Sequence, residues 1–592
     1  MILKNSVAPE LLQCTNAKLE SVTASTTNTA LGEKLFVQNS LILASFQAVP
    51  FMGWGDWEQD PLNNRSWQWR LNWLSFVSYL MAHHRASGDD AVLGCAAHAI
   101  ESWLDKYLET GTDYPFEFIW HDHATALRAE QLVFFVYYCR THAPAWAEAR
   151  STFLQYVERA LQVHAEWLAK DSFYSKHTNH GLEQARVLLL LGTVFEGPLA
   201  TEWQSIATRR ISSELHFSFT DEGVHVENSP AYHIFVFKVF ISIIKDYPDV
   251  VLGDLSEQFG QFSIKALGFI THILRPDGKL PPIGDTEQLP TSDGYREMFG
   301  HTLAYQNFVY ALTLGRQGVA PTTLNRIYPQ SGYAVFRDQW PAHAHYGKAF
   351  HLIAKVGCSS RYHHQQDEGH ISLYAGGEDW LIDSGLYNYI NTDPVRKYMR
   401  GRAAHNIPLI SQASYDKDFE HRLSSWRVSE HDEAASCAFV DMQIEVMPPV
   451  VHARRVEFDA QTKVVSVRDS VSATDGQVRN ITLQWHFPMD KTLRIEGNSV
   501  VVSSIKGNCL TICFEGATPD RLAVVSGRKD DRVFSCISYK ANQVEPSQLL
   551  QVLFTSRTSL QVVTHFEFAL AAAHIAPPRE APEQSDETVL SE

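Results

Sequence analysis

Three polar segments of the chain gather residue types that can move protons or hold a carboxylate. The first has the sequence HTNHGLEQA and contains Asn179, His180 and Glu183. His180 and Glu183 are three residues apart and share one face if the segment is helical. Amide and imidazole N–H groups can clamp a substrate carboxylate. In a purely structural interpretation, Asn179 caps a helix and Glu183 lies in its first turn.

The second segment, GVHVENSPAYHIFVF, contains His225, Glu227 and Tyr232. Its Ser-Pro pair predicts a helix start, which puts Tyr232 in the first turn beside a polar loop. A tyrosine in that place can donate or accept a proton in general acid–base catalysis. The structural alternative is a tyrosine that packs its ring and hydrogen-bonds its hydroxyl.

The third segment begins RYHHQQDEGHISLYAGGEDWLIDSG and is followed by RKYMRGRAAHN. A histidine-rich stretch at a strand edge, with Asp383 in LIDSG and a later His405, can ligate a divalent metal. The spacing matches no zinc finger or zinc ribbon. These residues therefore indicate a metal site without fixing its ligands.

The charges exclude one class of partner and suggest another. The formal net charge is −17, which argues against a nucleic-acid binder because such proteins carry a basic stripe. The run 396–402 gathers positive side chains, and we expect Arg400 and Arg402 in it to bind an anionic substrate. Its alternative is a solvated loop face. Arg128 is a further candidate for substrate binding.

Helices are predicted for the first half of the chain. Apolar residues recur at intervals of three and four, and the segments with this pattern are 71–84, 91–108, 124–139, 151–169, 181–195, 201–216, 231–247, 259–274 and 299–315. Helices of this length with short connections imply stacked antiparallel pairs, in a solenoid or an α/α toroid. Periodicity alone does not separate these two architectures.

The pattern changes near residue 330 to short alternating runs separated by turn residues, which is typical of an antiparallel β-sandwich. We predict helical residues 1–325, a sandwich over residues 326–575 and a disordered, proline- and acid-rich tail over residues 576–592. A chain of 592 residues is too long for one core. The eight scattered cysteines indicate buried free thiols.

Targeting features are few. The N-terminal sequence has no apolar signal-peptide core, and there is no apolar run long enough to span a membrane. We expect a cytoplasmic protein if this start is native, and a periplasmic or secreted one if a leader was removed. We expect no nucleic-acid or membrane partner, and the oligomeric state stays open.

The order of these segments resembles the heparinase II/III-like polysaccharide lyases, and almost as well the alginate lyases of the same architecture. The resemblance covers most of the chain and implies an α+β multidomain protein with an N-terminal (α/α) toroid followed by an antiparallel β-sandwich. It implies catalytic roles for Asn179-His180, Tyr232 and His363. It also implies substrate-binding roles around them for Glu183, His225 and Glu227.

The resemblance also implies a structural divalent metal: zinc, manganese or calcium. In many relatives the second histidine of an HxHxD-like strand ligates it together with an aspartate and a later histidine. The matching residues here are Gln365, Asp383 and His405, and glutamine is a poor ligand for zinc. His364 is the alternative ligand. No organic cofactor is expected.

The implied reaction is β-elimination from a uronic-acid polysaccharide to give 4,5-unsaturated products. Asn179 and His180 would neutralise the uronate carboxylate. Tyr232 would be the acid, and the base too when base and leaving group lie on one face, whereas His363 would be the base for the opposite C5 configuration. We expect an acidic polysaccharide or oligosaccharide substrate, with a glycosaminoglycan (hyaluronan, chondroitin or heparan sulfate) favoured over alginate.

Two other function classes remain. A glycoside hydrolase on a toroid would need two carboxyl groups about 5–9.5 Å apart, and Glu227 and Asp285 are the candidates. A non-catalytic carbohydrate-binding protein would not need the tyrosine. The product separates the first from a lyase, because hydrolysis leaves no conjugated double bond.

Overall fold

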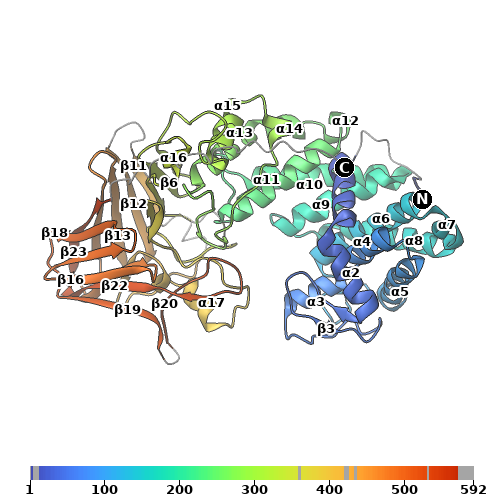
Figure 1. Cartoon of the computed structure of the whole chain (residues 1–592), viewed down its shortest axis with the longest axis horizontal. Helices are drawn as coiled ribbons and strands as arrows, with labels where there is room; N and C mark the ends of the chain where they lie inside the picture. Colours follow the sequence, from blue (N-terminus) through green and yellow to red (C-terminus); the bar gives the residue numbers. More distant parts are fainter. Residues whose placement is uncertain are drawn as a thin grey trace, which may run out of the picture. The chain divides into compact units, whose positions relative to one another are not determined.

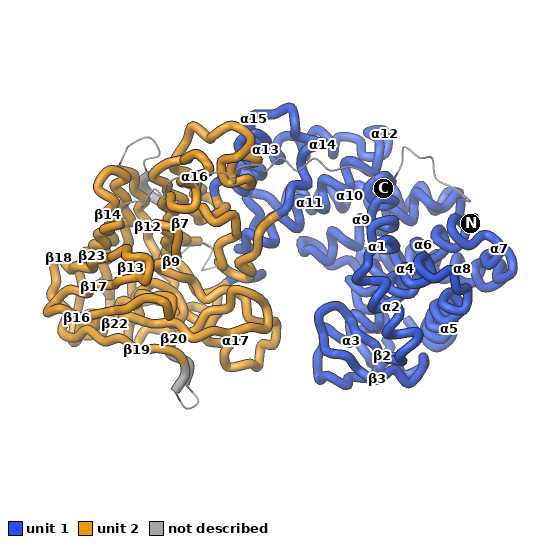
Figure 2. Tube along the Cα trace, viewed as in Figure 1, with its two compact units in different colours: residues 1–272, 292–308, 358–364 blue, residues 273–291, 309–357, 365–592 orange. Residues whose placement is uncertain are grey.

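The computed structural model describes residues 2–4, 12–111, 113–357, 360, 362–418, 426–431, 437–529 and 532–570. They form two compact units, and each unit is discontinuous in sequence (Figure 2). Unit 1 comprises residues 1–272, 292–308 and 358–364, and unit 2 comprises residues 273–291, 309–357 and 365–592. The predicted tail over residues 576–592 and Cys358 lie outside the described residues.

Unit 1 is built mainly of helices (Figure 1). They are α1 (Gln13–Ala24), α2 (Thr26–Gln38), α3 (Arg65–Asn72), α4 (Val77–Ser87), α5 (Asp90–Tyr107), α6 (Asp122–His142), α7 (Pro144–Ala149), α8 (Ser151–Ala169), α9 (Asn179–Val194), α10 (Pro198–Ser218), α11 (Pro230–Asp246), α12 (Asp249–Leu252), α13 (Leu255–Ile273), α14 (Arg296–Phe299) and α15 (Leu303–Leu312). The last residue of α13 and the end of α15 belong to unit 2.

Two predicted helices are interrupted. The segment 71–84 is divided between α3 and α4, because Leu74 has a left-handed backbone with φ of 60°. That conformation is unfavourable for a residue with a side chain and does not continue a helix. The segment 299–315 likewise begins with the end of α14 before α15 starts.

Helix α9 lies in the interior of unit 1. Every residue from Gly181 to Val194 is buried, and α9 packs against α6 and α10. A helix that is buried on all sides belongs to the core of a large protein. Its polar N-terminus is therefore held by a packed core.

Unit 2 contains three antiparallel sheets. The first has the order β5 (Arg326–Tyr328), β6 (Tyr333–Arg337), β7 (His351–Lys355), β8 (His370–Ala375) and β9 (Glu378–Leu381). The second has the order β11 (Trp426–His431), β12 (Cys437–Met447), β13 (Val450–Asp459), β14 (Val464–Ala473), β23 (Ser559–Ala569), β18 (Cys509–Glu515), β17 (Ser499–Ser504) and β16 (Lys491–Glu496). The third has the order β10 (Pro408–Ile410), β15 (Arg479–Phe487), β22 (Gln548–Arg557), β19 (Arg521–Lys529), β20 (Arg532–Ile537) and β21 (Glu545–Pro546).

Short elements complete the described chain. In unit 1, β1 (Ile2–Leu3) pairs with β4 (Phe195–Glu196), and β2 (Ser40–Leu41) pairs with β3 (Val49–Pro50). Unit 2 also has the helices α16 (His343–Tyr346) and α17 (Pro394–Met399). The 3-10 turns are η1 (Asp171–Phe173) and η2 (Arg402–Ala404).

One hydrophobic core joins the sheets of unit 2. Buried and half-buried residues alternate along β12, which is the pattern of a strand with one face on a core. Phe350 stacks on Phe458 with ring centroids 5.0 Å apart and meets Phe568 edge-on at 4.9 Å. The first and second sheets therefore share one apolar interior.

Two further features concern the described residues alone. The seven cysteines among them are all free thiols. None of the helices that the structure describes is long and apolar enough to cross a membrane.

Candidate active site

The N-terminus of α9 is presented by a braced turn. Thr178 is the N-cap and accepts a hydrogen bond from the Gly181 N–H at 3.1 Å, whereas we had considered Asn179 for that role. Gln184 accepts from the Ser175 N–H at 2.9 Å and donates to the Phe173 carbonyl at 2.8 Å. The turn is thus tied to the helix that follows it.

Because Thr178 is the N-cap, the side chain of Asn179 is not needed to cap the helix. Asn179 is half-buried and has no side-chain hydrogen bond to another described residue. An amide in this state can donate an N–H to a ligand.

Asp122, the first residue of α6, binds His180. Its Oδ2 atom accepts from His180 Nδ1 at 3.1 Å and also binds the Ser175 hydroxyl, and its Oδ1 atom lies 2.8 Å from His121 Nδ1. Burial raises the pKa of Asp122, but the hydrogen bonds and charges of His121 and His180 outweigh it and hold the pKa well below its usual range. Because Asp122 is an anion and fixes a proton on Nδ1 of His180, the His180 Nε2 donates only when the ring is an imidazolium.

The loop before α11 is clipped to the segment that carries His363. Ser229 caps α11 by accepting from the Tyr232 N–H, and Pro230 follows it. Asn228 has a φ of 58° and donates from its amide to the Ser360 and Tyr362 carbonyls at 2.8 and 3.1 Å. These bonds bring two distant parts of the sequence together within unit 1.

The predicted catalytic pair meets there. The rings of Tyr232 and His363 stack with centroids 3.6 Å apart and an interplanar angle of 22°. His363 has a φ of 53°, which is an uncommon conformation for a residue with a side chain and is found often at functional sites. Its Nε2 atom lies 3.5 Å from Glu227 Oε2.

Glu227 is a buried anion between histidines. Its Oε2 atom also lies 3.5 Å from His225 Nε2, and the Glu227 side chain is 3% exposed. Burial raises the pKa of Glu227, but the nearby His225, and then the charges of His363 and His180, lower it by more, so the net pKa is below the usual value. His180, His225, Glu227, His363 and Tyr232 thus belong to one electrostatic site.

Two residues expected to bind substrate have structural roles instead. Arg128 is fully buried and donates to the Asn72 and Ile119 carbonyls at 2.8 Å. Glu183 is buried and ion-paired with Arg186 at 2.7 Å. Both expectations are corrected, because both side chains are buried and bound to partners inside unit 1.

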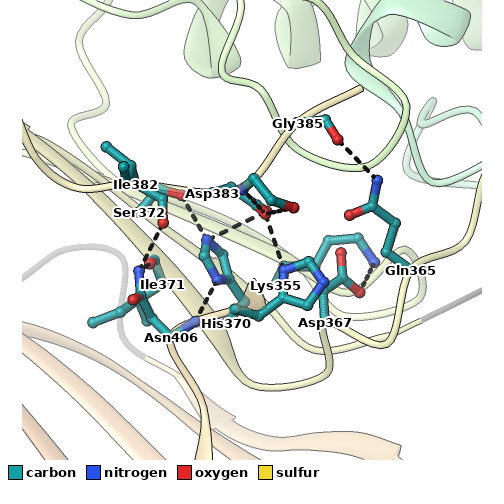
Figure 3. Close-up of polar contacts among 12 residues, drawn as sticks. Lys355, Gln365, Asp367, His370, Ile371, Ser372, Ile382, Asp383, Gly385 and Asn406 are labelled. Carbon is teal, nitrogen blue, oxygen red and sulfur yellow. Dashed lines mark hydrogen bonds and ion pairs between the residues drawn. The ribbon is translucent and has the colours of Figure 1, made fainter. Parts of the chain in front are cut away.

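Unit 2 holds the metal-type cluster (Figure 3). His370, Asp383 and His405 are buried and place one ligand atom each within 4.8 Å of one another. His364, expected as a ligand, is not in this cluster and belongs to unit 1. His370 lies outside the motif positions from which the ligands were predicted.

The proton positions separate the two histidines of the cluster. His405 Nδ1 donates to Asp383 Oδ1 at 2.9 Å, so the other ring nitrogen, Nε2, carries the lone pair. That Nε2 atom has no hydrogen-bond partner among the described residues. His370 Nδ1 accepts from the Asn406 N–H at 3.0 Å, so its proton is on Nε2, 2.8 Å from the Ser372 hydroxyl and 3.4 Å from Asp383 Oδ2. A protonated nitrogen does not ligate a metal. His370 Nε2 is therefore not a candidate ligand, and it forms no hydrogen bond with Asp383 Oδ2.

Two buried oxygen atoms of unit 2, one of them in the cluster, are also candidate donors to a cation. Asp383 Oδ2 and Gln365 Oε1 have no hydrogen bond to any described residue. The Gln365 amide nitrogen donates to the carbonyl of Gly385, two residues after Asp383, at 3.4 Å (Figure 3). Buried polar atoms without partners are costly, and a cation would satisfy them.

The expected basic patch of unit 2 is largely internal. Arg402 is 7% exposed and pairs with Glu368 at 3.2 Å, so its assignment to substrate binding is corrected. Arg396 forms two bonds of 2.8 Å to Asp285. Arg400 is half-buried, and its substrate role stays a prediction.

Comparison with known proteins now decides the family. The model described as "Heparinase II/III N-terminus" matches residues 4–307, and the model described as "Heparinase II/III-like, C-terminal" matches residues 320–568. The chain belongs to the heparinase II/III family. The resemblance stated from the sequence is thereby confirmed.

Relatives within the heparinase II/III family are distant. The chain is 22% identical over 391 residues to a heparin-sulfate lyase of Pedobacter heparinus, covering 62% of this chain and 56% of that protein. It is 23% identical over 447 residues to a heparin-sulfate lyase of Bacteroides thetaiotaomicron, covering 72% and 62%. The matches therefore span less than two thirds of these relatives' lengths.

Solved structures confirm the fold class. A crystal structure of heparinase III gives a TM-score of 0.76 at 18% identity and covers 95% of this chain and 90% of that one. The heparan sulfate lyase of Pedobacter heparinus gives 0.66 at 18% identity and covers 95% and 88%. The predicted toroid followed by an antiparallel β-sandwich is the fold of this heparinase II/III family member.

Sequence reasoning missed Asp122 and His123. His123 lies with its ring centroid 4.5 Å from that of His180, and burial lowers its pKa to about 4. The triplet His121-Asp122-His123 is visible in the sequence. Only the packing of α6 against α9 reveals that it faces His180.

Proposed function

We propose that this chain is a polysaccharide lyase that cleaves heparan sulfate by β-elimination. The observation that carries the proposal is the stack of Tyr232 on His363 with Glu227 behind it, in the same unit as His180. The heparin-sulfate lyases to which the chain is similar support this substrate within the glycosaminoglycans.

The first requirement of the reaction is to make the C5 proton of the uronate acidic. Asn179 donates its amide N–H to the carboxylate, and His180 donates Nε2–H as an imidazolium stabilised by Asp122. Both donors stabilise the enolate-like charge that develops when the proton leaves. One preorganised donor of this kind contributes about 2.7–4 kcal/mol.

Proton transfer is the second requirement. Tyr232 delivers a proton to the glycosidic oxygen on C4 as the C4–O bond breaks, and the electron pair of the C5–H bond forms the C4–C5 double bond. Tyr232 or His363 takes the C5 proton, depending on the configuration at C5. Each general acid or base contributes about 10²–10⁴-fold.

The hydrolase alternative has less support. Both oxygens of Asp285 accept from Arg396 at 2.8 Å, and the aspartate is 3% exposed. A carboxylate held in a buried bidentate pair with arginine is not available as a general acid. Of the two candidate carboxyl groups, Asp285 is therefore unavailable for the hydrolytic mechanism.

A panel of polymers tests the proposal. Purified protein is incubated with heparan sulfate, heparin, hyaluronan, chondroitin sulfate, dermatan sulfate and alginate while ultraviolet absorbance is followed. We expect the absorbance of the conjugated enoate to rise with heparan sulfate. New reducing ends without that absorbance would mean hydrolysis. A rise in absorbance with another polymer and not with heparan sulfate would make that polymer the substrate.

We also propose that Asp383, His405 and Gln365 hold a structural divalent cation in unit 2. The donors that lack hydrogen bonds are two oxygen atoms and one imidazole nitrogen. Hard oxygen donors mixed with one imidazole suit manganese, whereas calcium takes oxygen ligands alone. Such an ion would neutralise Asp383 and tie the loop after β9 to the loop after η2.

Metal analysis with matched histidine variants tests this second proposal. Bound metal is counted in the purified protein, and thermal unfolding is followed with a chelator and with manganese, calcium or zinc restored. We expect His405→Asn to abolish binding and the metal-dependent rise in Tm, and His370→Asn to weaken it less. Equal loss in both variants would contradict the assigned proton positions, and no metal-dependent stability in the wild type would contradict the site.

A further inference from the structure

An aromatic side chain extends the site from His180 onto α3. The ring of Trp69 lies 5.2 Å from that of His123, which lies 4.5 Å from that of His180. Trp69 is half-buried, so part of its indole stays accessible. A partly exposed indole one side chain away from His180 can pack against a sugar ring.

Arg70, the next residue of α3, is a cation without a counter-ion in the part of the chain that the structure describes. Its guanidinium carbon lies 5.5 Å from the centroid of the Trp69 ring, and its side chain has no hydrogen bond or ion pair to any described residue. The residue is half-buried, and burial lowers its pKa. This is unusual in a chain with a net charge of −17, where acidic partners are abundant.

Arg65, on the same helix as Arg70, does have an acidic partner. Arg65 binds Glu117 through two nitrogen atoms, at 2.9 and 2.7 Å. Partial desolvation of a guanidinium without such a partner is unfavourable. An anionic ligand group would offset this desolvation cost by accepting two parallel charge-assisted hydrogen bonds from the guanidinium.

We propose that Trp69 and Arg70 form a subsite for a sulfated sugar next to the uronate that is cleaved. The indole packs against the ring, and the guanidinium binds a sulfate group on it. In heparan sulfate the neighbour of each uronate is a glucosamine, which carries the N- and O-sulfates that this guanidinium would select. The inference rests on the proposed function and adds to it the choice of the sulfated regions of the polymer.

The measurement is the ratio of kcat/KM on heparan sulfate to kcat/KM on the unsulfated polymer of the same backbone. We expect Arg70→Gln to lower this ratio about tenfold, through KM, because a charge-assisted bond to sulfate is lost. Arg70→Lys should give an intermediate ratio, since lysine keeps the charge and loses the fork. Arg65→Gln on the same helix is the matched control and should keep the wild-type ratio.

Equal loss on both polymers would overturn the proposal, because both carry the uronate carboxylate and only one carries sulfate. An unchanged ratio would overturn it as well. Binding of sulfated and unsulfated oligosaccharides to the Tyr232→Phe protein, with and without Arg70→Gln, gives the same comparison by calorimetry. This binding measurement requires no turnover. It therefore tests the proposed subsite even if the proposed reaction is wrong.

Discussion

The imidazole of His363 stacks on the phenol of Tyr232 with ring centroids 3.6 Å apart, and its Nε2 atom lies 3.5 Å from Glu227. Asn228 fixes this arrangement by holding the carbonyl groups of Ser360 and Tyr362. The geometry provides two proton-transfer groups in contact, with an anion behind one of them.

Replacement of Glu227 by glutamine should lower kcat. The change removes the negative charge that orients His363 and balances its proton while nearly preserving shape. We expect a decrease of about 10²-fold, the size of one general acid–base contribution. Steady-state kinetics on heparan sulfate measures it, and Glu227→Asp should recover part of the loss. Wild-type kcat in a folded Glu227→Gln protein would show that the anion is not needed.

Asp122→Asn should weaken the carboxylate clamp. Asparagine can still accept from His180 Nδ1, but it does not stabilise the imidazolium that donates from Nε2. We expect kcat/KM to fall by about tenfold or more. Asp90→Asn is the control, because Asp90 is also the first residue of its helix and lies 3.4 Å from a histidine, His84, outside the site. Equal effects of the two substitutions would contradict a specific role for Asp122.

Gly181→Ala should disturb the turn that presents His180. An added Cβ would lie 2.3 Å from the Ser175 carbonyl oxygen and 3.1 Å from Glu214 Oε1, and the first of these is a backbone atom. Activity and Tm should both fall. Gly94→Ala in the middle of α5 meets nothing within 4 Å and should instead stabilise by about 0.5–1 kcal/mol. A stable, active Gly181→Ala protein would show that the turn can shift.

Glu214→Gln should change how stability depends on pH. Burial raises the pKa of Glu214 to about 7 against the pull of its bonds from Tyr174 and from the His177 N–H. A raised pKa means that the folded state favours the neutral acid, so its contribution is complete below the unfolded pKa near 4.5 and is lost as pH rises through about 7.

The wild type should therefore lose stability relative to Glu214→Gln between pH 5 and 8, by on the order of 3 kcal/mol. Denaturant unfolding at several pH values measures the difference. A difference that does not vary with pH would mean that Glu214 is ionised in the folded protein.

The sequence predicted the order of helices and strands because period-3.6 and period-2 patterns are local. It did not predict the interruption at Leu74, because a left-handed residue inside an apolar run leaves no pattern of its own. Tyr232 and His363 were found because the segments that carry them resemble motifs of the heparinase II/III-like lyases.

Charged residues were harder to place. Arg128 and Arg402 are candidates for substrate binding in sequence, yet both are buried with internal partners. Asp122 and His370 were missed because their importance comes from contacts between distant segments, with His180 and with Asp383. Periodicity shows which residues are buried but not which buried charges have partners.

The mass of the oligosaccharides released from heparan sulfate tests the proposed elimination directly. We predict that the wild type releases chains whose nonreducing ends are unsaturated, lighter by one water than the products of hydrolysis. We also predict that Tyr232→Phe, folded and still binding the polymer, releases essentially none. Saturated products from the wild type, or unsaturated products at the wild-type rate from Tyr232→Phe, would contradict it.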